Sequence, residues 1–231
     1  MAAGAAAEFK ELSFNPYKKD KRFLSNYFLL VASIDQGSLV GKAENAGMII
    51  SYLWKKLQSQ LFYLGDENKL RELLTPFDKK IKAQNFYEIP RILHSAINFI
   101  NTNCNGDVYT WAKKFKEPIE IIEEIATSIY YMGRGKKSAR KKCCMYLRWM
   151  VRDYPDLRVF DHLSPAKLYI PLDKNTGKVF KALGVLKNSS PTWKDVENAT
   201  LWVKEKLYPD DPAKVDYPFF LLGRKLPFPN P

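Results

Sequence analysis

Apolar residues recur at intervals of three and four positions along most of this chain. Phe23, Tyr27, Leu30 and Ile34 show the pattern near the start. This spacing places apolar side chains on one face of an α-helix. It predicts helices over residues 23–34, 48–57, 67–74, 87–100, 108–115, 118–132, 136–152, 174–183, 193–208 and 212–222.

The segments between these helices carry boundary signals of their own. Residues 35–38, Asp-Gln-Gly-Ser, separate the first two helices, while Pro191-Thr192 and Asp210-Asp211-Pro212 are typical helix starts. No stretch alternates between apolar and polar residues well enough to predict a strand. The sequence therefore predicts an all-α protein.

Composition adds a core and a positive charge to this picture. The 231 residues are 46% hydrophobic, which is enough to bury a sizeable core. Lys and Arg outnumber Asp and Glu by 37 to 25, so the formal net charge is +12. Such a charge favours a polyanionic partner, although solvated lysine faces give the same balance.

The cysteines and the apolar runs of the sequence give no sign of a disulfide-rich, secreted or membrane protein. The three cysteines include the neighbours Cys143 and Cys144, a spacing that suits neither a disulfide framework nor a metal site, so we expect apolar packing roles. The N-terminus lacks the features of a signal peptide, and no apolar run is long enough to span a bilayer. We expect a soluble, intracellular protein.

The segment from Gly133 to Lys137 reads Gly-Arg-Gly-Lys-Lys and precedes the helix predicted over 136–152. Two glycines let the backbone turn tightly and expose its N–H groups, and a helix N-terminus adds unpaired donors and a positive dipole end. Such a corner suits a phosphate. The segment therefore indicates a nucleic-acid-binding turn.

Lys137 lies in the first turn of this predicted helix, among several other cations. A lysine becomes nucleophilic only where its surroundings disfavour the charged form, and like charges and a helix N-terminus both do so. Asp173 follows at the predicted start of the next helix, where it is a favoured cap and is able to return beside Lys137. A simple phosphate contact for Lys137 and a simple cap for Asp173 are the alternatives. The cations around Lys137 are Arg134, Lys136, Arg140, Lys141 and Lys142.

Three segments, in order, resemble the helix-hairpin-helix DNA glycosylases. Gly133-Arg134-Gly135-Lys136-Lys137-Ser138-Ala139 is similar to the hairpin of the members that are also lyases. Leu172-Asp173-Lys174-Asn175-Thr176 resembles the segment that carries their catalytic aspartate, although the usual histidine is absent. Residues 216–224 resemble the last helix of the archaeal 8-oxoguanine branch. The resemblance covers about residues 125–225, and the chain lacks the four-cysteine signature of the iron–sulfur branch.

The resemblance implies a role for each matching residue. Lys137 would be the nucleophile that forms a Schiff base with the sugar, and Asp173 the catalytic carboxylate; Lys136 is the nearest rival of Lys137. The expected DNA-binding residues are Gly133, Arg134, Gly135, Lys136 and Lys141, and those of the base pocket are Asp216, Phe220 and Gln36. Asp216 would otherwise be a solvated charge or the partner of a lysine. No metal is expected beyond a monovalent cation held by hairpin carbonyls.

The same resemblance implies two helical subdomains with a cleft between them. We expect an N-terminal segment over 1–21, a helical subdomain over 22–115, a hairpin subdomain over 116–187, and C-terminal helices over 188–231 that pack back on the first subdomain. The expected partner is damaged double-stranded DNA, with no membrane and no obligate protein partner. A cytoplasmic, nucleoid-associated location follows.

The leading hypothesis from sequence is a bifunctional DNA glycosylase and AP lyase that removes oxidised guanine. A non-catalytic helix-hairpin-helix module that binds nucleic acid through the same basic turn is the first alternative. A glycosylase for a different damaged base is the second.

Overall fold

The computed structural model describes residues 15, 19–135, 137–187 and 191–226, and these residues form helices and loops without a strand. The prediction of an all-α protein is confirmed. The α-helices are α2 (Lys21–Ile34), α3 (Gly37–Val40), α4 (Ala43–Leu57), α5 (Glu67–Asp78), α6 (Ile89–Thr102), α7 (Val108–Ala112), α8 (Pro118–Ser128), α9 (Lys141–Val151), α10 (Lys174–Ala182), α11 (Trp193–Lys206) and α12 (Asp216–Lys225). Short 3-10 helices are η2 (Gln58–Tyr63), η3 (Phe86–Glu88), η4 (Pro165–Lys167) and η5 (Pro212–Val215).

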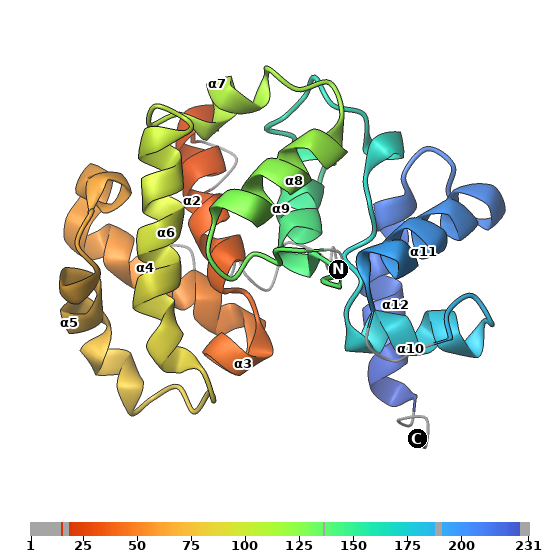
Figure 1. Cartoon of the computed structure of the whole chain (residues 1–231), viewed down its shortest axis with the longest axis horizontal. Helices are drawn as coiled ribbons and strands as arrows, with labels where there is room; N and C mark the ends of the chain where they lie inside the picture. The colour runs from red at the N-terminus through yellow and green to blue at the C-terminus, as the bar shows by residue number, and fades with distance from the viewer. Residues whose placement is uncertain (1–14, 16–18, 136, 188–190, 227–231) are drawn as a thin grey trace.

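Helix α2 forms the centre of the larger part of the molecule. Every residue from Leu24 to Ile34 is buried, and α4, α6, α7 and α9 pack against this helix (Figure 1). A helix that is apolar on all sides belongs inside a protein. Its few polar side chains have partners: Asn26 donates to the Gly106 carbonyl at 2.9 Å and accepts from the Val108 amide at 3.0 Å. We call α2 to α9 the first helical group.

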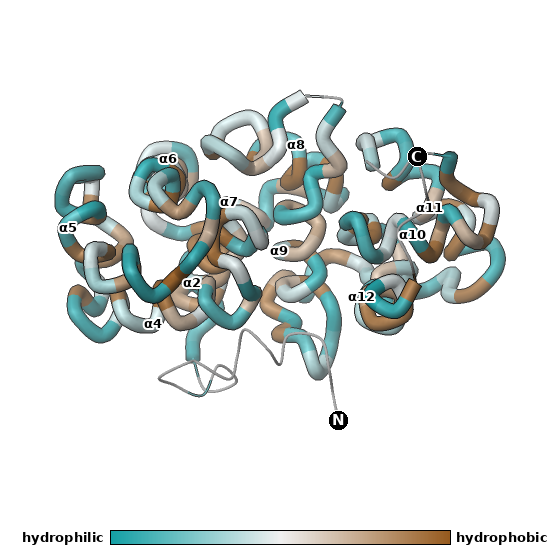
Figure 2. The backbone as a smooth tube through the Cα atoms, turned by 90° about the horizontal axis from the view of Figure 1, so that it is seen from below, coloured by the Kyte–Doolittle hydropathy of each residue, from teal (hydrophilic) through white to brown (hydrophobic). Residues whose placement is uncertain are grey.

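Helices α10, α11 and α12 form a second helical group. Figure 2 shows them gathered at one end of the molecule, with α9 between them and α2. The Phe180 ring of α10 lies 5.2 Å from that of Phe219 on α12 and 6.1 Å from that of Trp202 on α11. Helices α10 and α12 cross so closely that a Cβ on Gly223 would lie 2.0 Å from the Asn175 carbonyl oxygen.

This packing differs from the expected division of the chain. The hairpin subdomain was predicted over 116–187, with the helices after residue 188 returning to the first subdomain. Instead α9 packs on α2, whereas α12 packs on α10. The reason is that α10 buries its apolar side, including Val179 and Phe180, against the helices that follow it.

Helix boundaries agree with the sequence in most places and depart from it around residue 136. Helix α8 ends at Ser128 and α9 begins at Lys141, five residues after the predicted start. Gly133 and Gly135 have φ angles of 100° and 91°, and Arg140 before α9 has a φ of 49°. These left-handed conformations exclude the segment from a helix. A further difference is that the helix predicted over 212–222 divides into η5 and α12.

Two other expectations concern the cysteines and membranes. Cys104, Cys143 and Cys144 are buried free thiols, which confirms their packing role. No helix in the described part of the chain is long and apolar enough to cross a membrane.

Candidate functional site

Lys141, the first residue of α9, lies where the two helical groups meet. Its Nζ donates to Oδ2 of Asp35 at 3.0 Å. Asp35 caps the C-terminal end of α2, so this contact joins residues 106 positions apart in sequence. The side chain of Asp35 is only 6% exposed, whereas that of Lys141 is 27% exposed. The amine therefore has a buried partner, while part of the Lys141 side chain stays exposed.

Asp173 brings a second carboxylate to this amine. It is the N-cap of α10, and its Oδ1 accepts from the Asn175 and Thr176 amides at 2.8 Å each and from the Thr176 hydroxyl at 3.1 Å. The predicted capping role is confirmed. Three donors fix the orientation of this carboxylate, and its negative charge acts on Lys141.

Asp216, the first residue of α12, supplies the third carboxylate. It is 5% exposed and forms a short ion pair with Nη1 of Arg148 on α9. Burial raises the pKa of Asp216, while the charges of Arg148 and Lys141 oppose the rise. Asp216 was expected to contact a flipped base, but its carboxylate is turned toward Arg148. We call Lys141, Asp35, Asp173 and Asp216 the Lys141 cluster.

The cluster decides the charge of Lys141. Burial alone would lower the pKa of this amine, but the charges of Asp35, Asp173 and Asp216 and the hydrogen bond to Asp35 outweigh burial, so its pKa is raised. Lys141 is therefore an ammonium ion in the free protein at neutral pH. It becomes a nucleophile only after giving up a proton.

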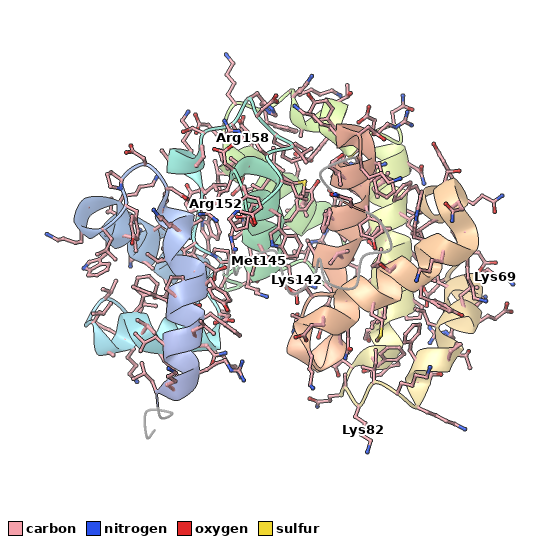
Figure 3. The ribbon with its side chains drawn as sticks, turned by 180° about the vertical axis from the view of Figure 1, so that it is seen from behind. Lys69, Lys82, Lys142, Met145, Arg152 and Arg158 are labelled. Carbon is pink, nitrogen blue, oxygen red and sulfur yellow. The ribbon has the colours of Figure 1, made fainter. Side chains whose placement is uncertain are left out.

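The next residue, Lys142, has the opposite surroundings. Lys142 is buried in the middle of the molecule (Figure 3), where its Nζ donates to the Ser33 carbonyl at 2.7 Å and lies 4.9 Å from the centre of the Tyr131 ring. Burial lowers the pKa of Lys142 to about 7. This lysine lies too deep to reach a substrate, and its contacts tie the start of α9 to the end of α2.

The glycine turn before α9 has the shape that the sequence predicts. A Cβ on Gly133 would lie 2.5 Å from Oγ of Ser138 and 3.2 Å from Cα of Arg140, so this position requires glycine. Arg134 is exposed, and its Nη2 donates to the Thr127 carbonyl at the end of α8 at 3.0 Å. Gly135 is exposed as well. Lys136, expected at the same turn, lies outside the described residues.

The predicted place of Lys137 is wrong. Lys137 precedes α9 by four residues instead of lying in its first turn, and its exposed side chain has no hydrogen bond or ion pair with any described residue. The lysine that interacts with Asp173 is Lys141, which was expected only to contact DNA. Sequence offered only a weak signal: Lys141 and Lys142 are the last two cations before the apolar stretch that begins at Cys143.

The remaining base-pocket candidates, Gln36 and Phe220, come from different helical groups. Gln36 is exposed at the N-cap of α3, where its Nε2 donates to Oγ of Ser38 at 3.0 Å, and it follows Asp35 directly. Phe220 is half-buried on α12, with the Arg224 guanidinium 5.9 Å from its ring centre. No hydrogen bond or ring contact among the described residues joins Gln36, Asp216 and Phe220.

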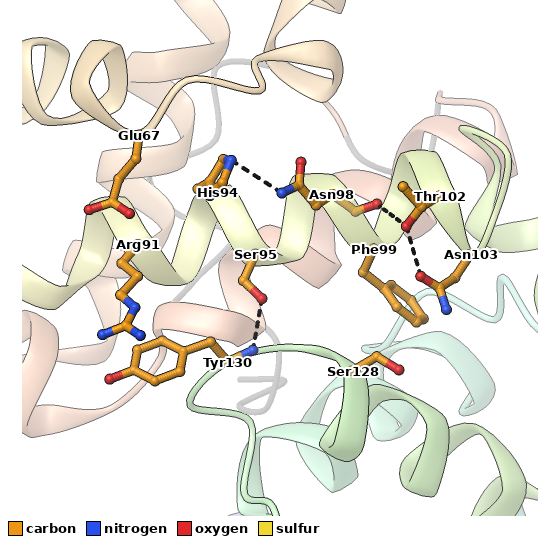
Figure 4. Close-up of a pocket in the computed structure, with 10 residues that line it drawn as sticks. All are labelled: Glu67, Arg91, His94, Ser95, Asn98, Phe99, Thr102, Asn103, Ser128 and Tyr130. Atoms are coloured by element: carbon orange, nitrogen blue, oxygen red, sulfur yellow. Dashed lines mark hydrogen bonds between the residues drawn. The ribbon is translucent and has the colours of Figure 1, made fainter.

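Two surface cavities lie away from the Lys141 cluster. The first, of about 430 Å³, lies between α6 and the end of α8, where the Arg91 guanidinium covers the Tyr130 ring at 4.2 Å (Figure 4). The second, of about 500 Å³, lies near the C-terminal end of α9 and is lined by Arg152 and Asp211. Neither cavity includes a residue of the cluster. Within the described ranges no three His, Cys, Asp or Glu side chains are grouped as metal ligands.

Comparison with known proteins places the chain in a family without assigning it an activity. No curated protein matches the chain. The family described as "Protein of unknown function (DUF2400)" matches residues 58–225, a segment that includes Lys141, Asp173 and Asp216 but begins after Asp35. This match covers more than half of the sequence. The chain therefore belongs to the DUF2400 family.

Proposed function

We propose that this protein is a DNA glycosylase and AP lyase of the helix-hairpin-helix type that removes oxidised guanine from damaged double-stranded DNA. The observation that supports the proposal best is the Lys141 cluster: an amine at the N-terminus of a helix, next to carboxylates from three other parts of the chain. Lys141 takes the nucleophilic role that the sequence assigned to Lys137, and Asp173 keeps its role.

The proposed reaction starts with extrusion of the damaged nucleotide, because a base inside a duplex cannot be reached. The negative charge of Asp173 stabilises the positive charge that develops on the sugar. The neutral amine of Lys141 then bonds to C1′ while the C1′–base bond breaks, and the base leaves with the bonding electron pair.

Strand cleavage follows from the same covalent intermediate. The nitrogen attached to C1′ gives one proton to the ring oxygen as the sugar opens, which leaves an iminium ion. Loss of a C2′ proton then expels the 3′ phosphate, so that the strand is cut on the 3′ side. A lysine nucleophile thus couples base excision to strand cleavage.

DNA binding would use the turn and the start of α9. Gly133 and Gly135 turn the backbone with positive φ angles, and the exposed Arg134 and Lys137 place positive charge at this turn, where a phosphate would bind. The net charge of +12 attracts the phosphate backbone over a longer range. In this proposal the DNA lies across the junction of the two helical groups, and carbonyls of the turn bind a monovalent cation.

Borohydride trapping tests the proposal directly. The protein is incubated with a duplex that contains 8-oxoguanine or an abasic site, and a reduced Schiff base appears as a covalent protein–DNA complex. We expect trapping by the wild-type protein and by Lys137→Ala, and no trapping by Lys141→Ala. Trapping by Lys141→Ala at the wild-type level would reject Lys141. Cleavage of a panel of lesion duplexes separates oxidised guanine from other damaged bases.

A second candidate function is a non-catalytic module that binds nucleic acid. The raised pKa of Lys141 favours this alternative, because an amine that stays charged binds phosphate well and attacks nothing. The two functions differ in the same trapping experiment. Wild-type protein that binds DNA tightly but forms no trapped complex, with either lesion, would establish the binding module and exclude the enzyme.

A further inference from the structure

The proposed function leaves one chemical step open, which is the removal of a proton from Lys141. The amine is held as an ammonium ion by the charges around it. An acceptor must therefore take this proton before the nitrogen attacks C1′. Of the three carboxylates that act on Lys141, Asp216 is already paired with Arg148, which leaves Asp35 and Asp173.

The hydrogen bonds of these two carboxylates differ. Oδ1 of Asp173 already accepts three hydrogen bonds from the start of α10, which hold this group as an oriented negative charge. Asp35 has a different environment, because its Oδ2 accepts a hydrogen bond from Nζ of Lys141 itself at 3.0 Å. A proton-transfer partner must be within hydrogen-bond reach, and Asp35 meets that condition directly.

We propose that Asp35 is the group that deprotonates Lys141. The Nζ proton moves along the existing hydrogen bond to Oδ2 of Asp35, and the freed nitrogen lone pair bonds to C1′. The base departs with the electron pair of the broken bond and is protonated by water. Asp35 thus accepts the proton from Lys141, whereas Asp173 stabilises the positive charge on the sugar.

Burial explains why this transfer would occur when DNA binds. The Asp35 side chain is 6% exposed and that of Lys141 is 27% exposed, so the water next to these two side chains lies on the Lys141 side. DNA covering the junction removes that water, and a charged pair loses more from desolvation than a neutral acid and amine. The other charges that face Lys141 are Asp173 of α10, Asp216 of α12, which Arg148 partly neutralises, and Lys142 of α9.

Single-turnover kinetics of Asp35→Asn test this inference, which rests on the proposed function. We expect base excision at neutral pH to slow by about 100-fold with unchanged DNA affinity, because a positioned base contributes about that factor. The deficit should shrink as the pH rises from about 7 to about 9, because hydroxide then removes the proton in place of the carboxylate. The matched control is Asp211→Asn. Asp211 lies near the opposite end of α9, where its carboxylate is 2.9 Å from Nε of Arg152.

The outcomes separate the inference from the proposed function. A wild-type rate in Asp35→Asn, or an equal deficit at every pH, would overturn the role of Asp35 while trapping by wild-type protein upholds the enzyme. An absence of trapping in wild-type protein would overturn the enzyme itself. If Asp35→Asn does not fold, Asp35→Glu replaces it: the retained carboxylate should keep the rate within about tenfold of wild type, and a loss like that of Lys141→Ala would count against proton transfer.

Discussion

Arg148 of α9 and Asp216 of α12 form a buried ion pair that joins the two helical groups. Arg148 also lies 3.5 Å from Asp156. The Asp156 carboxylate accepts a hydrogen bond, at 2.5 Å, from Arg152, the residue that caps the C-terminal end of α9. Charges buried in this way are stable only as a set, since each one is dehydrated and depends on its partners. The pair also holds the start of α12 against α9.

Removing one member of this pair should destabilise the protein strongly. Arg148→Met leaves Asp216 buried without its main cationic partner, and we expect a loss of about 3–5 kcal/mol in the free energy of unfolding. Urea denaturation followed by circular dichroism measures the loss. Replacing both residues, as in Arg148→Met with Asp216→Leu, should recover part of it. A single variant within about 1 kcal/mol of wild type would show that the pair contributes little.

The crossing of α10 and α12 should depend on Gly223. In Gly223→Ala the new Cβ would overlap the Asn175 carbonyl oxygen, so the two helices must separate, at a cost of about 1–3 kcal/mol. Gly37→Ala is the matched control, because a Cβ on Gly37 meets no atom within 4 Å. Chemical denaturation of both variants checks the prediction. Equal stability of the two variants would show that the crossing of α10 and α12 does not require a glycine.

Lys142 should make stability depend on pH. Its pKa in the folded protein, about 7, lies well below the ordinary lysine value, so between the two values the unfolded chain binds more protons than the folded one. The free energy of unfolding should therefore rise as the pH rises above about 7. Below about pH 7 the folded protein buries a charged amine, and the full cost of that burial lowers its stability. Lys142→Met should be more stable than wild type at about pH 6. This advantage should shrink by at most about 4 kcal/mol between about pH 6 and about pH 10.

Urea midpoints across this pH range measure the effect. Lys55→Met on the exposed surface of α4 is the control, because it makes the same substitution without removing a buried amine. A difference between Lys142→Met and wild type that does not change with pH would contradict the burial of an uncharged amine.

Asp173 should affect turnover far more than it affects binding. Asp173→Asn removes the charge but keeps a good N-cap, so α10 stays intact while excision falls by about 100-fold or more. Single-turnover rates and DNA affinities, measured on the same duplex, separate the two effects. Asp66→Asn is the control, since Asp66 caps α5 through the Asn68 and Lys69 amides and lies outside the proposed site. Equal losses of rate and affinity would make Asp173 a structural residue.

Local patterns in the sequence determined the helices and the turn. Apolar spacing located α2 and α6, Asp173 was predicted as a cap, and Gly133 and Gly135 were predicted to turn the chain, because each of these features depends on residues only a few positions apart. Buried free cysteines followed from their spacing in the same way.

Only the tertiary structure decided which lysine meets Asp173. The left-handed Arg140 delays the start of α9, so Lys141 takes the place that sequence assigned to Lys137. The contact of Lys141 with Asp35 joins residues 106 positions apart, and the pairing of Arg148 with Asp216 joins residues 68 apart. Such contacts depend on how whole helices pack. Helical periodicity predicts which face of a helix is buried, but it does not predict which other helix covers that face.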